Sequence, residues 1–168
     1  TEKCDTADAA FQSEETGLVD YVGNEEDIFV QIRDLISVLP SNNEDDTYYT
    51  ESEDDLNRVC ADLADCAGDT SILLSNIADD NLFIETKAAY AKEMVTGFLR
   101  LNGQTVGAVA NRTEVYDAEG IKTGNFDAVL TREGAEKAAE FVKFCDAFEI
   151  PVLSLTNVTG FKADIHSE

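Results

Sequence analysis

The chain has few basic side chains and a single histidine, and both shortages exclude functions. Its 168 residues contain 12 Lys and Arg against 35 Asp and Glu, for a net charge of −23. Contacts with nucleic-acid phosphates need clusters of Lys and Arg, so no nucleic-acid partner is expected. His166 lies close to the end of the chain, which argues against a histidine-centred catalytic triad and against a His-rich metal site.

Long apolar runs and paired cysteines are also missing. No stretch approaches the ~20 apolar residues of a membrane-spanning helix, and the first residues lack the features of a signal peptide. We therefore expect a cytoplasmic protein without a direct membrane span. No zinc-ligand spacing occurs among the four cysteines, so reduced thiols and no metal are expected at Cys4, Cys60, Cys66 and Cys145.

The remaining composition is that of a folded protein. With 43% hydrophobic and 28% charged residues and 2 prolines, the chain is expected to form one domain or two partial ones. Residues 1–69 hold 20 acidic and 3 basic side chains, and solubility or a salt-rich habitat is a sufficient explanation for most of these carboxylates. Because translation starts with Met, the opening Thr1 leads us to expect a processed product or a piece of a longer protein.

In the first part of the chain, local patterns predict a strand over residues 17–22 and a helix from Asn24 to Leu39 that ends at Pro40. An acidic linker over residues 41–55 is the predicted module boundary. Two further helices are predicted over residues 54–66 and, capped by Asp69, over residues 70–77. The apolar stripe of the first helix comprises Ile28, Phe29, Ile32, Leu35, Ile36 and Leu39.

The second part of the chain changes to strand patterns. Asn102 and Gly103 separate two apolar runs, which predicts a β-hairpin. After a polar loop over residues 113–127, Thr131 should cap a long helix, and residues 150–155 form an apolar run typical of a strand buried on both faces. Strand, helix and strand together predict a βαβ crossover. The expected apolar side of the helix comprises Ala135, Ala138, Ala139, Val142, Phe144, Cys145 and Phe148.

The loop after that last strand, TNVTGFKAD at residues 156–164, is the first place to look for a site, because ligands bind beyond the carboxyl ends of strands in open α/β sheets. Consecutive amides near Gly160 could face a developing negative charge, although a plain surface turn would also use this glycine. Nothing in the sequence pairs the carboxylates Glu85, Asp127 and Asp146, so solvated or capping roles are expected for them.

Three longer strings are familiar together: RDLISVLPSNNEDD at residues 33–46, YAKEMVTGFLRLNGQTVGAVANR at 90–112 and GAEKAAEFVKFCDAFEIPVLSLTNVTGF at 134–161. They resemble the carboxyltransferase subunits of biotin-dependent acyl-CoA carboxylases and decarboxylases. The resemblance implies an α/β fold, a crotonase-like (ββα spiral) fragment with a parallel sheet, flanking helices and an N-terminal helical tail. It also implies that residues 1–50 end the first, acyl-CoA half and its linker, and that residues 51–168 begin the second, biotin half.

The same resemblance implies a function. The parent protein would move a carboxyl group between carboxybiotin, held on a partner carrier protein or domain, and a short acyl-CoA thioester, with anions stabilised by main-chain amides. It would be a homo-oligomer, and this piece alone would be inactive. The alternative is a non-catalytic acidic scaffold or interaction module with a partial crotonase-like core.

Site residues also follow from the resemblance. Gly160 and Phe161 match the Gly-Phe of the family's biotin loop and are the expected catalytic positions. Thr159 stands where the family has Pro, and Arg112 where it has Gln. The implied substrate-binding positions are Asn157, Thr159, Lys162, Asn111, Thr96 and Gly97.

Overall fold

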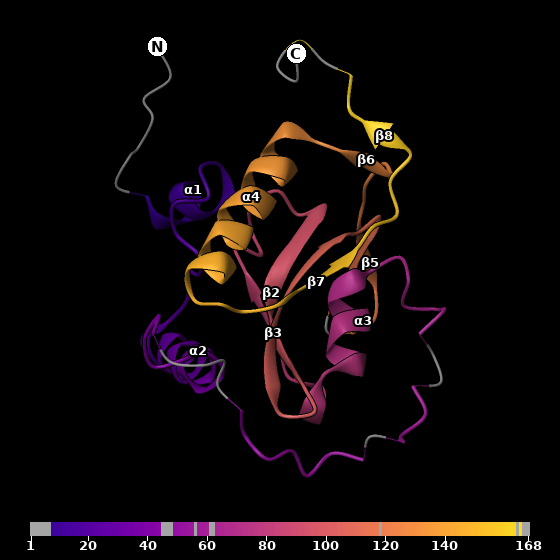
Figure 1. Cartoon of the computed structure of the whole chain (residues 1–168). Helices are drawn as coiled ribbons and strands as arrows, with labels where there is room; N and C mark the ends of the chain where they lie inside the picture. Colours follow the sequence, from indigo (N-terminus) through magenta and orange to yellow (C-terminus); the bar gives the residue numbers. More distant parts are fainter. Residues whose placement is uncertain are drawn as a thin grey trace.

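The computed structural model describes residues 8–44, 49–55, 57–60, 63–117, 119–163 and 165 (Figure 1). Cys4, Tyr48, Leu56, Asp164 and His166 lie outside the described residues. The helices and strands in chain order are α1 (Ala9–Glu14), α2 (Glu25–Val38), α3 (Thr70–Ile77), the 3-10 helix η1 (Asp79–Asn81), β1 (Phe83–Thr86), β2 (Met94–Leu101), β3 (Gln104–Asn111), β4 (Glu114–Tyr116), β5 (Lys122–Asn125), β6 (Val129–Leu130), α4 (Arg132–Ala147), β7 (Val152–Leu155) and β8 (Gly160–Phe161).

A four-stranded mixed sheet with the order β1-β2-β3-β7 forms the centre of the fold. The first three strands are antiparallel, and β7 pairs in parallel with β3 after the chain has passed through α4. The predicted βαβ crossover is therefore confirmed. β7 lies at one edge of this sheet, with Val152 39% exposed, so the expectation of a strand buried on both faces is wrong.

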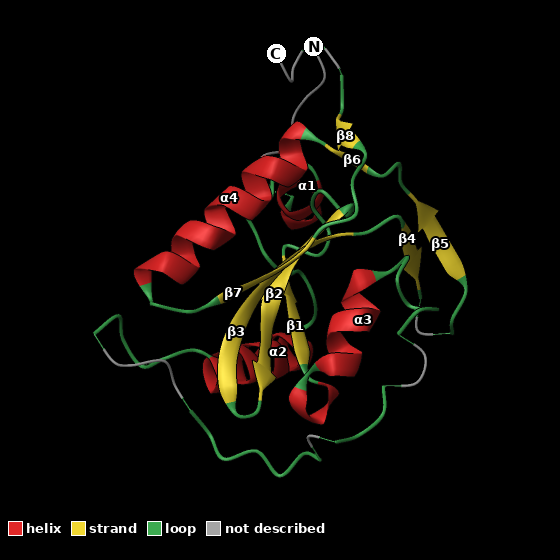
Figure 2. Ribbon diagram, turned by 45° about the vertical axis from the view of Figure 1, so that its right-hand side comes forward, coloured by secondary structure: helices red, strands yellow, loops and turns green. Residues whose placement is uncertain are grey.

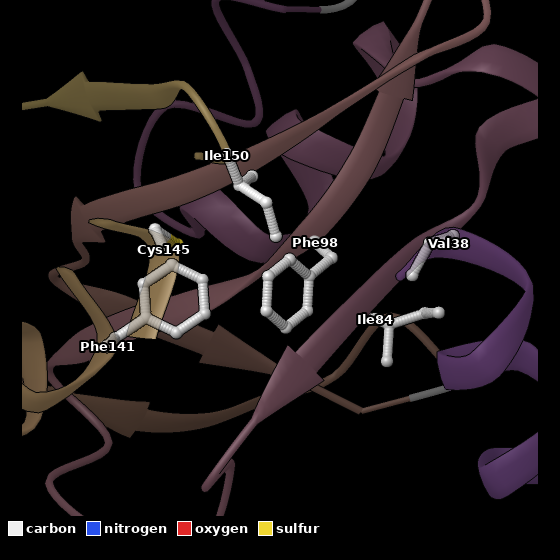
Figure 3. Close-up of a cluster of buried hydrophobic side chains, with 6 residues drawn as sticks. All are labelled: Val38, Ile84, Phe98, Phe141, Cys145 and Ile150. Atoms are coloured by element: carbon white, nitrogen blue, oxygen red, sulfur yellow. The ribbon is translucent and has the colours of Figure 1, made fainter. Parts of the chain in front are cut away.

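Helices cover both faces of the sheet (Figure 2), and each face has its own core. On one face α2 and α4 pack around Phe98, whose ring centroid lies 4.9 Å from that of Phe141 (Figure 3). On the other face α3 inserts Leu74 between β2 and β3 side chains. The alternation along β2 explains the arrangement, because successive side chains of a strand point to opposite faces. The α3-side core comprises Leu74, Ala78, Val95, Leu99, Ala108 and Ala110.

The three predicted helix caps are confirmed. The side chain of Asn24 accepts from the Asp27 amide, that of Asp69 from the Ser71 amide and that of Thr131 from the Gly134 amide. Each bond satisfies an amide that has no partner inside the helix. The sequence therefore placed the starts of α2, α3 and α4 correctly.

The predicted hairpin is also confirmed. Asn102 and Gly103 have φ angles of 52° and 79°, as a two-residue turn between antiparallel strands requires. The carboxylate of Asp79 accepts hydrogen bonds from both turn amides, at 3.0 Å from Asn102 and 2.6 Å from Gly103. The turn is thus stabilised by the Asp79 side chain as well as by its own backbone angles.

We expect Gly103→Ala to destabilise the protein more than Gly120→Ala. Both glycines have a positive φ, 79° and 77°, so both substitutions carry the left-handed backbone cost of about 1–2 kcal/mol. A Cβ at Gly103 would also lie 1.9 Å from the Thr50 carbonyl oxygen, whereas nothing lies within 4 Å at Gly120. Urea unfolding of the two variants isolates this contact; equal losses would show that the segment at Thr50 moves away freely.

Three predicted elements differ in the structure. Residues 17–22 form no strand but an irregular connection, because they have no partner strand and Leu18, Tyr21 and Val22 remain 77%, 46% and 44% exposed. The polar loop over residues 113–127 instead contains the β4–β5 hairpin. The predicted helix over residues 54–66 is absent from its described part. There Arg58 donates to the carbonyl oxygens of Asn76 and Ala78, which draws this segment across the end of α3.

The apolar faces of the helices were predicted only in part. In α2 the last turn reaches the core through Leu35, Val38 and Leu39, while Phe29, Val30, Ile32 and Ile36 are 45–67% exposed. In α3 the buried residues are Thr70 and Leu74, and Ile72 is 36% exposed. In α4 the buried positions are Gly134, Lys137, Phe141 and Cys145. Within the described residues, no helix has the length and apolar character to cross a membrane.

Candidate functional site

The candidate site lies where two parallel strands end. β3 and β7 run in the same direction with Ala110 opposite Leu155, so their carboxyl ends meet at one edge of the sheet. Asn111, the last residue of β3, is 8% exposed. Its Nδ2 donates to the carbonyl oxygen of Asn157 at 2.8 Å, and its Oδ1 accepts from the Asn157 amide at 2.6 Å. The structure therefore brings together two residues that the sequence marked separately.

The other side of the same loop is held by β6, which pairs in parallel with β8. The Thr159 amide donates to the Ala128 carbonyl oxygen at 2.8 Å, and the Thr159 hydroxyl donates to the same oxygen at 2.9 Å. The Lys162 amide donates to the Leu130 carbonyl oxygen. Proline, which the resembled family has in place of Thr159, has no amide hydrogen and could not make the first of these bonds. The loop is thus hydrogen-bonded to the end of β3 on one side and to β6 and the residue before it on the other.

Between these anchors, Gly160 and Phe161 are exposed. A Cβ built on Gly160 would meet nothing within 4 Å, and Phe161 is 79% exposed. A ligand atom can therefore approach the main chain here without displacing any neighbouring side chain. Main-chain amides in such a position can stabilise an anion when a ligand covers them and excludes water.

Lys162 lies at a cavity of about 540 Å³ beside this loop. Its polar lining is mostly acidic, and the carboxylates are those of Glu14, Glu15, Glu93, Asp127 and Glu133. This charge disfavours an anionic ligand inside the cavity itself. Substrate binding by Lys162 stays a prediction. In the described part of the chain, no group of three or more His, Cys, Asp or Glu side chains is arranged to hold a metal ion.

Thr96 and Gly97 lie elsewhere, in the middle of β2. Thr96 is 1% exposed, and its hydroxyl lies 2.9 Å from that of Thr86 on β1. A Cβ at Gly97 would lie 2.3 Å from the Ile84 carbonyl oxygen, so the close approach of β1 itself requires glycine there. Thr96 lines a separate cavity of about 290 Å³, together with Phe98 and others. The structure does not bring this pair to the loop after β7, and a substrate role for it stays a prediction.

Directly after Asn111, Arg112 forms a buried charge cluster that the sequence did not predict. Arg112 is 5% exposed, and its guanidinium nitrogens lie 3.5 Å from Oδ1 of Asp69 and 3.2 Å from Oε1 of Glu85. Its Nε donates to the Lys92 carbonyl oxygen. Asp69 also accepts from the Tyr116 amide at 3.1 Å. The cluster thereby ties β1, the start of α3 and β4 to the end of β3. An arginine directly after an apolar strand was the one available signal.

Lys137 is a second buried cation on the α4 side. It is 2% exposed, and its Nζ donates to the carbonyl oxygens of Lys87, Tyr90 and Met94 at 2.8, 2.8 and 2.6 Å. These three bonds close the connection between β1 and β2. In that connection Lys87 and Ala91 have positive φ angles of 49° and 42°.

Burial shifts the pKa values of Lys137 and Glu85. Burial lowers the pKa of Lys137 to about 8, and the charge of Glu85 opposes that shift. Burial raises the pKa of the Glu85 carboxyl above its ordinary value, while the charge of Arg112 opposes the rise. The two clusters therefore influence one another through Glu85.

The family model described as "Carboxyl transferase domain" matches residues 5–168. The chain belongs to the carboxyl transferase domain family.

The relatives of this carboxyl transferase chain are longer than the chain itself. The propionyl-CoA carboxylase beta chain of Roseobacter denitrificans is 34% identical over 168 residues, which cover 96% of this chain and 29% of the relative. The methylmalonyl-CoA carboxyltransferase 12S subunit of Propionibacterium freudenreichii subsp. shermanii is 32% identical, and the match covers 91% of this chain and 29% of that subunit. The carboxyl transferase chain thus spans less than a third of the length of these relatives.

A solved structure confirms the fold. Transcarboxylase 12S, described as a hexamer assembly with methylmalonyl-coenzyme A and methylmalonic acid bound, superposes with a TM-score of 0.78 at 30% identity, covering 94% of this chain and 30% of that one. The expected crotonase-like fold and the family resemblance are therefore confirmed for the carboxyl transferase chain. Its predicted division into two halves near residue 50 stays a prediction.

Proposed function

We propose that the complete protein containing this chain moves a carboxyl group between biotin on a carrier protein or domain and a short acyl-CoA. The observation that carries the proposal is the carboxyl transferase domain match over residues 5–168. Relatives named for propionyl-CoA and methylmalonyl-CoA support a short acyl group, and the hexameric relative supports a homo-oligomer. This chain alone should be inactive, since it spans less than a third of those relatives.

The loop after β7 fits the biotin side of this reaction. When bound, biotin would accept the carboxyl group from the acyl-CoA, and carboxybiotin would donate it in the reverse direction. The main chain at Gly160 and Phe161 would hold it, because this backbone is exposed and no neighbouring atom occupies the space above Gly160. Fixed amides cost little reorganisation as negative charge develops, so the role of this loop is to supply preorganised N–H donors.

The test is carboxyl transfer by the complete gene product from methylmalonyl-CoA to a biotinylated carrier, followed by chromatography of propionyl-CoA. We expect turnover in the wild type and a loss of about 100-fold in Gly160→Val, because the side chain fills the approach to the amides. Gly124→Ala on β5 is the matched control, since its Cβ would make only ordinary contacts of 3.5 Å or more. An inactive wild type with several short acyl-CoA thioesters, or an unimpaired Gly160→Val enzyme, would count against the proposal.

The second candidate is a non-catalytic interaction module, and the exposed apolar side chains of α2 favour it. Phe29, Val30, Ile32 and Ile36 are 45–67% exposed and belong to neither core cluster of the described residues. Such a surface normally contacts another protein segment. The activity measurement separates the two, because an interaction module would not transfer the carboxyl group under any of these conditions.

A further inference from the structure

We propose that Asn111 is a positioning residue for the loop Asn157–Phe161: it sets where the Gly160 and Phe161 main chain lies and does not itself contact substrate. This inference rests on the proposed function, because it assigns a cause to the placement of the same loop. It changes the substrate-binding role that the sequence suggested for Asn111.

The side chain of Asn111 bonds both main-chain polar atoms of Asn157, and this pair of bonds is called the clamp. Both polar ends of its side-chain amide bond the main chain of one residue, with Nδ2 on the Asn157 carbonyl and Oδ1 on the Asn157 amide. An asparagine amide is suited to this task because it offers a donor and an acceptor side by side without a net charge. The two bonds fix the Asn157 main chain to the end of β3, beyond the last β3–β7 pair at Ala110 and Leu155.

Burial separates this role from substrate contact. Asn111 is 8% exposed, whereas Gly160 and Phe161 are exposed beyond it. At the opposite end of the loop, the amides of Thr159 and Lys162 donate to the carbonyl oxygens of Ala128 and Leu130 at β6. Asn111 therefore holds the loop to the central sheet. The bonds to Ala128 and Leu130 hold the same loop to the segment that leads into α4.

Loss of the clamp should affect turnover more than substrate affinity. Catalysis by fixed donors depends on placement, and a displacement of about 1 Å can cost about 100-fold in rate. In Asn111→Ala both bonds disappear. In Asn111→Asp the acceptor for the Asn157 amide remains, but the donor to the Asn157 carbonyl is replaced by a negative charge. Both variants should therefore have a lower kcat with a nearly unchanged KM for acyl-CoA.

The experiment compares wild type, Asn111→Ala, Asn111→Asp and Ser154→Ala in the complete gene product. Ser154 is the matched control, because it is an exposed polar residue of β7 whose hydroxyl contacts only Thr156 among the described bonds. Steady-state kinetics are measured for acyl-CoA and for the biotinylated carrier. Amide hydrogen exchange at Asn157 and thermal unfolding are measured in parallel.

We expect kcat to fall about 100-fold in Asn111→Ala, with faster exchange at the Asn157 amide and a cooperative unfolding transition. Ser154→Ala should match the wild type. A raised KM for the carrier at constant kcat would show direct substrate contact and overturn the inference, as would full activity in Asn111→Ala. An inactive wild type contradicts the proposed function itself, whereas an active wild type with unaltered exchange in Asn111→Ala contradicts only the clamp.

Discussion

Replacing Arg112 with glutamine should lower the free energy of unfolding by about 3–5 kcal/mol, because removing one partner of a buried ion pair leaves its charge uncompensated. The side chains of Arg112, Asp69 and Glu85 are 5%, 3% and 15% exposed. Oε1 of Glu85 is buried and accepts no hydrogen bond in the described structure; it has only the ion-pair contact with this guanidinium. The shorter, neutral glutamine cannot satisfy both carboxylates.

Urea unfolding at neutral pH measures this loss. Arg132→Gln is the matched control, because Arg132 pairs with Glu136 on an exposed part of α4 and the variant should unfold close to the wild type. Adding Glu85→Gln to Arg112→Gln removes one of the uncompensated charges and should restore part of the loss. If Arg112→Gln unfolds at the same urea concentration as the control, the cluster contributes nothing to stability.

The second large effect is expected for Lys137→Met, which should cost about 3 kcal/mol. Methionine fills a similar volume but leaves the carbonyl oxygens of Lys87, Tyr90 and Met94 without their shared donor, and each unsatisfied buried group costs about 1–3 kcal/mol. Lys143→Met on the exposed side of α4 is the control. The loss is measured by urea unfolding at neutral pH, and equal midpoints for the two variants would contradict it.

The same pair of proteins tests the pKa of Lys137, which burial lowers from 10.5 to about 8. Between these two values the unfolded chain holds a proton that the folded chain has released, so the lysine's contribution to stability increases with rising pH. The stability gap between wild type and Lys137→Met should therefore widen from about pH 8 upward. A gap that narrows over this range would show that the three carbonyls hold the charged form more firmly than burial opposes it.

Features set by a few neighbouring residues could be predicted from the sequence. The caps Asn24, Asp69 and Thr131 act within three residues of themselves, and the Asn102–Gly103 turn depends on backbone angles that these two residues adopt readily. The βαβ crossover followed because a strand, a helix and a strand in succession have one common arrangement. These predictions needed no knowledge of distant contacts.

Elements whose form depends on distant partners were predicted wrongly. Residues 54–66 have a helical apolar period, but bonds from Arg58 to the end of α3 prevail over that local preference. In α4 the predicted apolar side did not include Lys137, and lysine is rarely buried. The lysine lies inside because three carbonyl oxygens of another segment meet its amine. Neither partner set could be read from the sequence around these residues.

The candidate site was also predictable only in part. The loop after β7 followed from strand order, and the structure shows it joined to Asn111. The charge cluster beneath it joins Asp69, Glu85 and Arg112, which are far apart in the chain. Pairing between such residues depends on how the strands are registered, which no local pattern reports.

The position of β7 at the edge of the sheet has a consequence for how copies of this chain meet. An edge strand exposes main-chain donors and acceptors that can pair with a strand from another molecule, and Val152 adds exposed apolar area there. The net charge of −23 keeps such molecules apart at low ionic strength. The screening length shrinks from about 10 Å at 0.1 M salt to about 3 Å at 1 M. Concentrated salt therefore removes the repulsion and leaves the edge open to self-association.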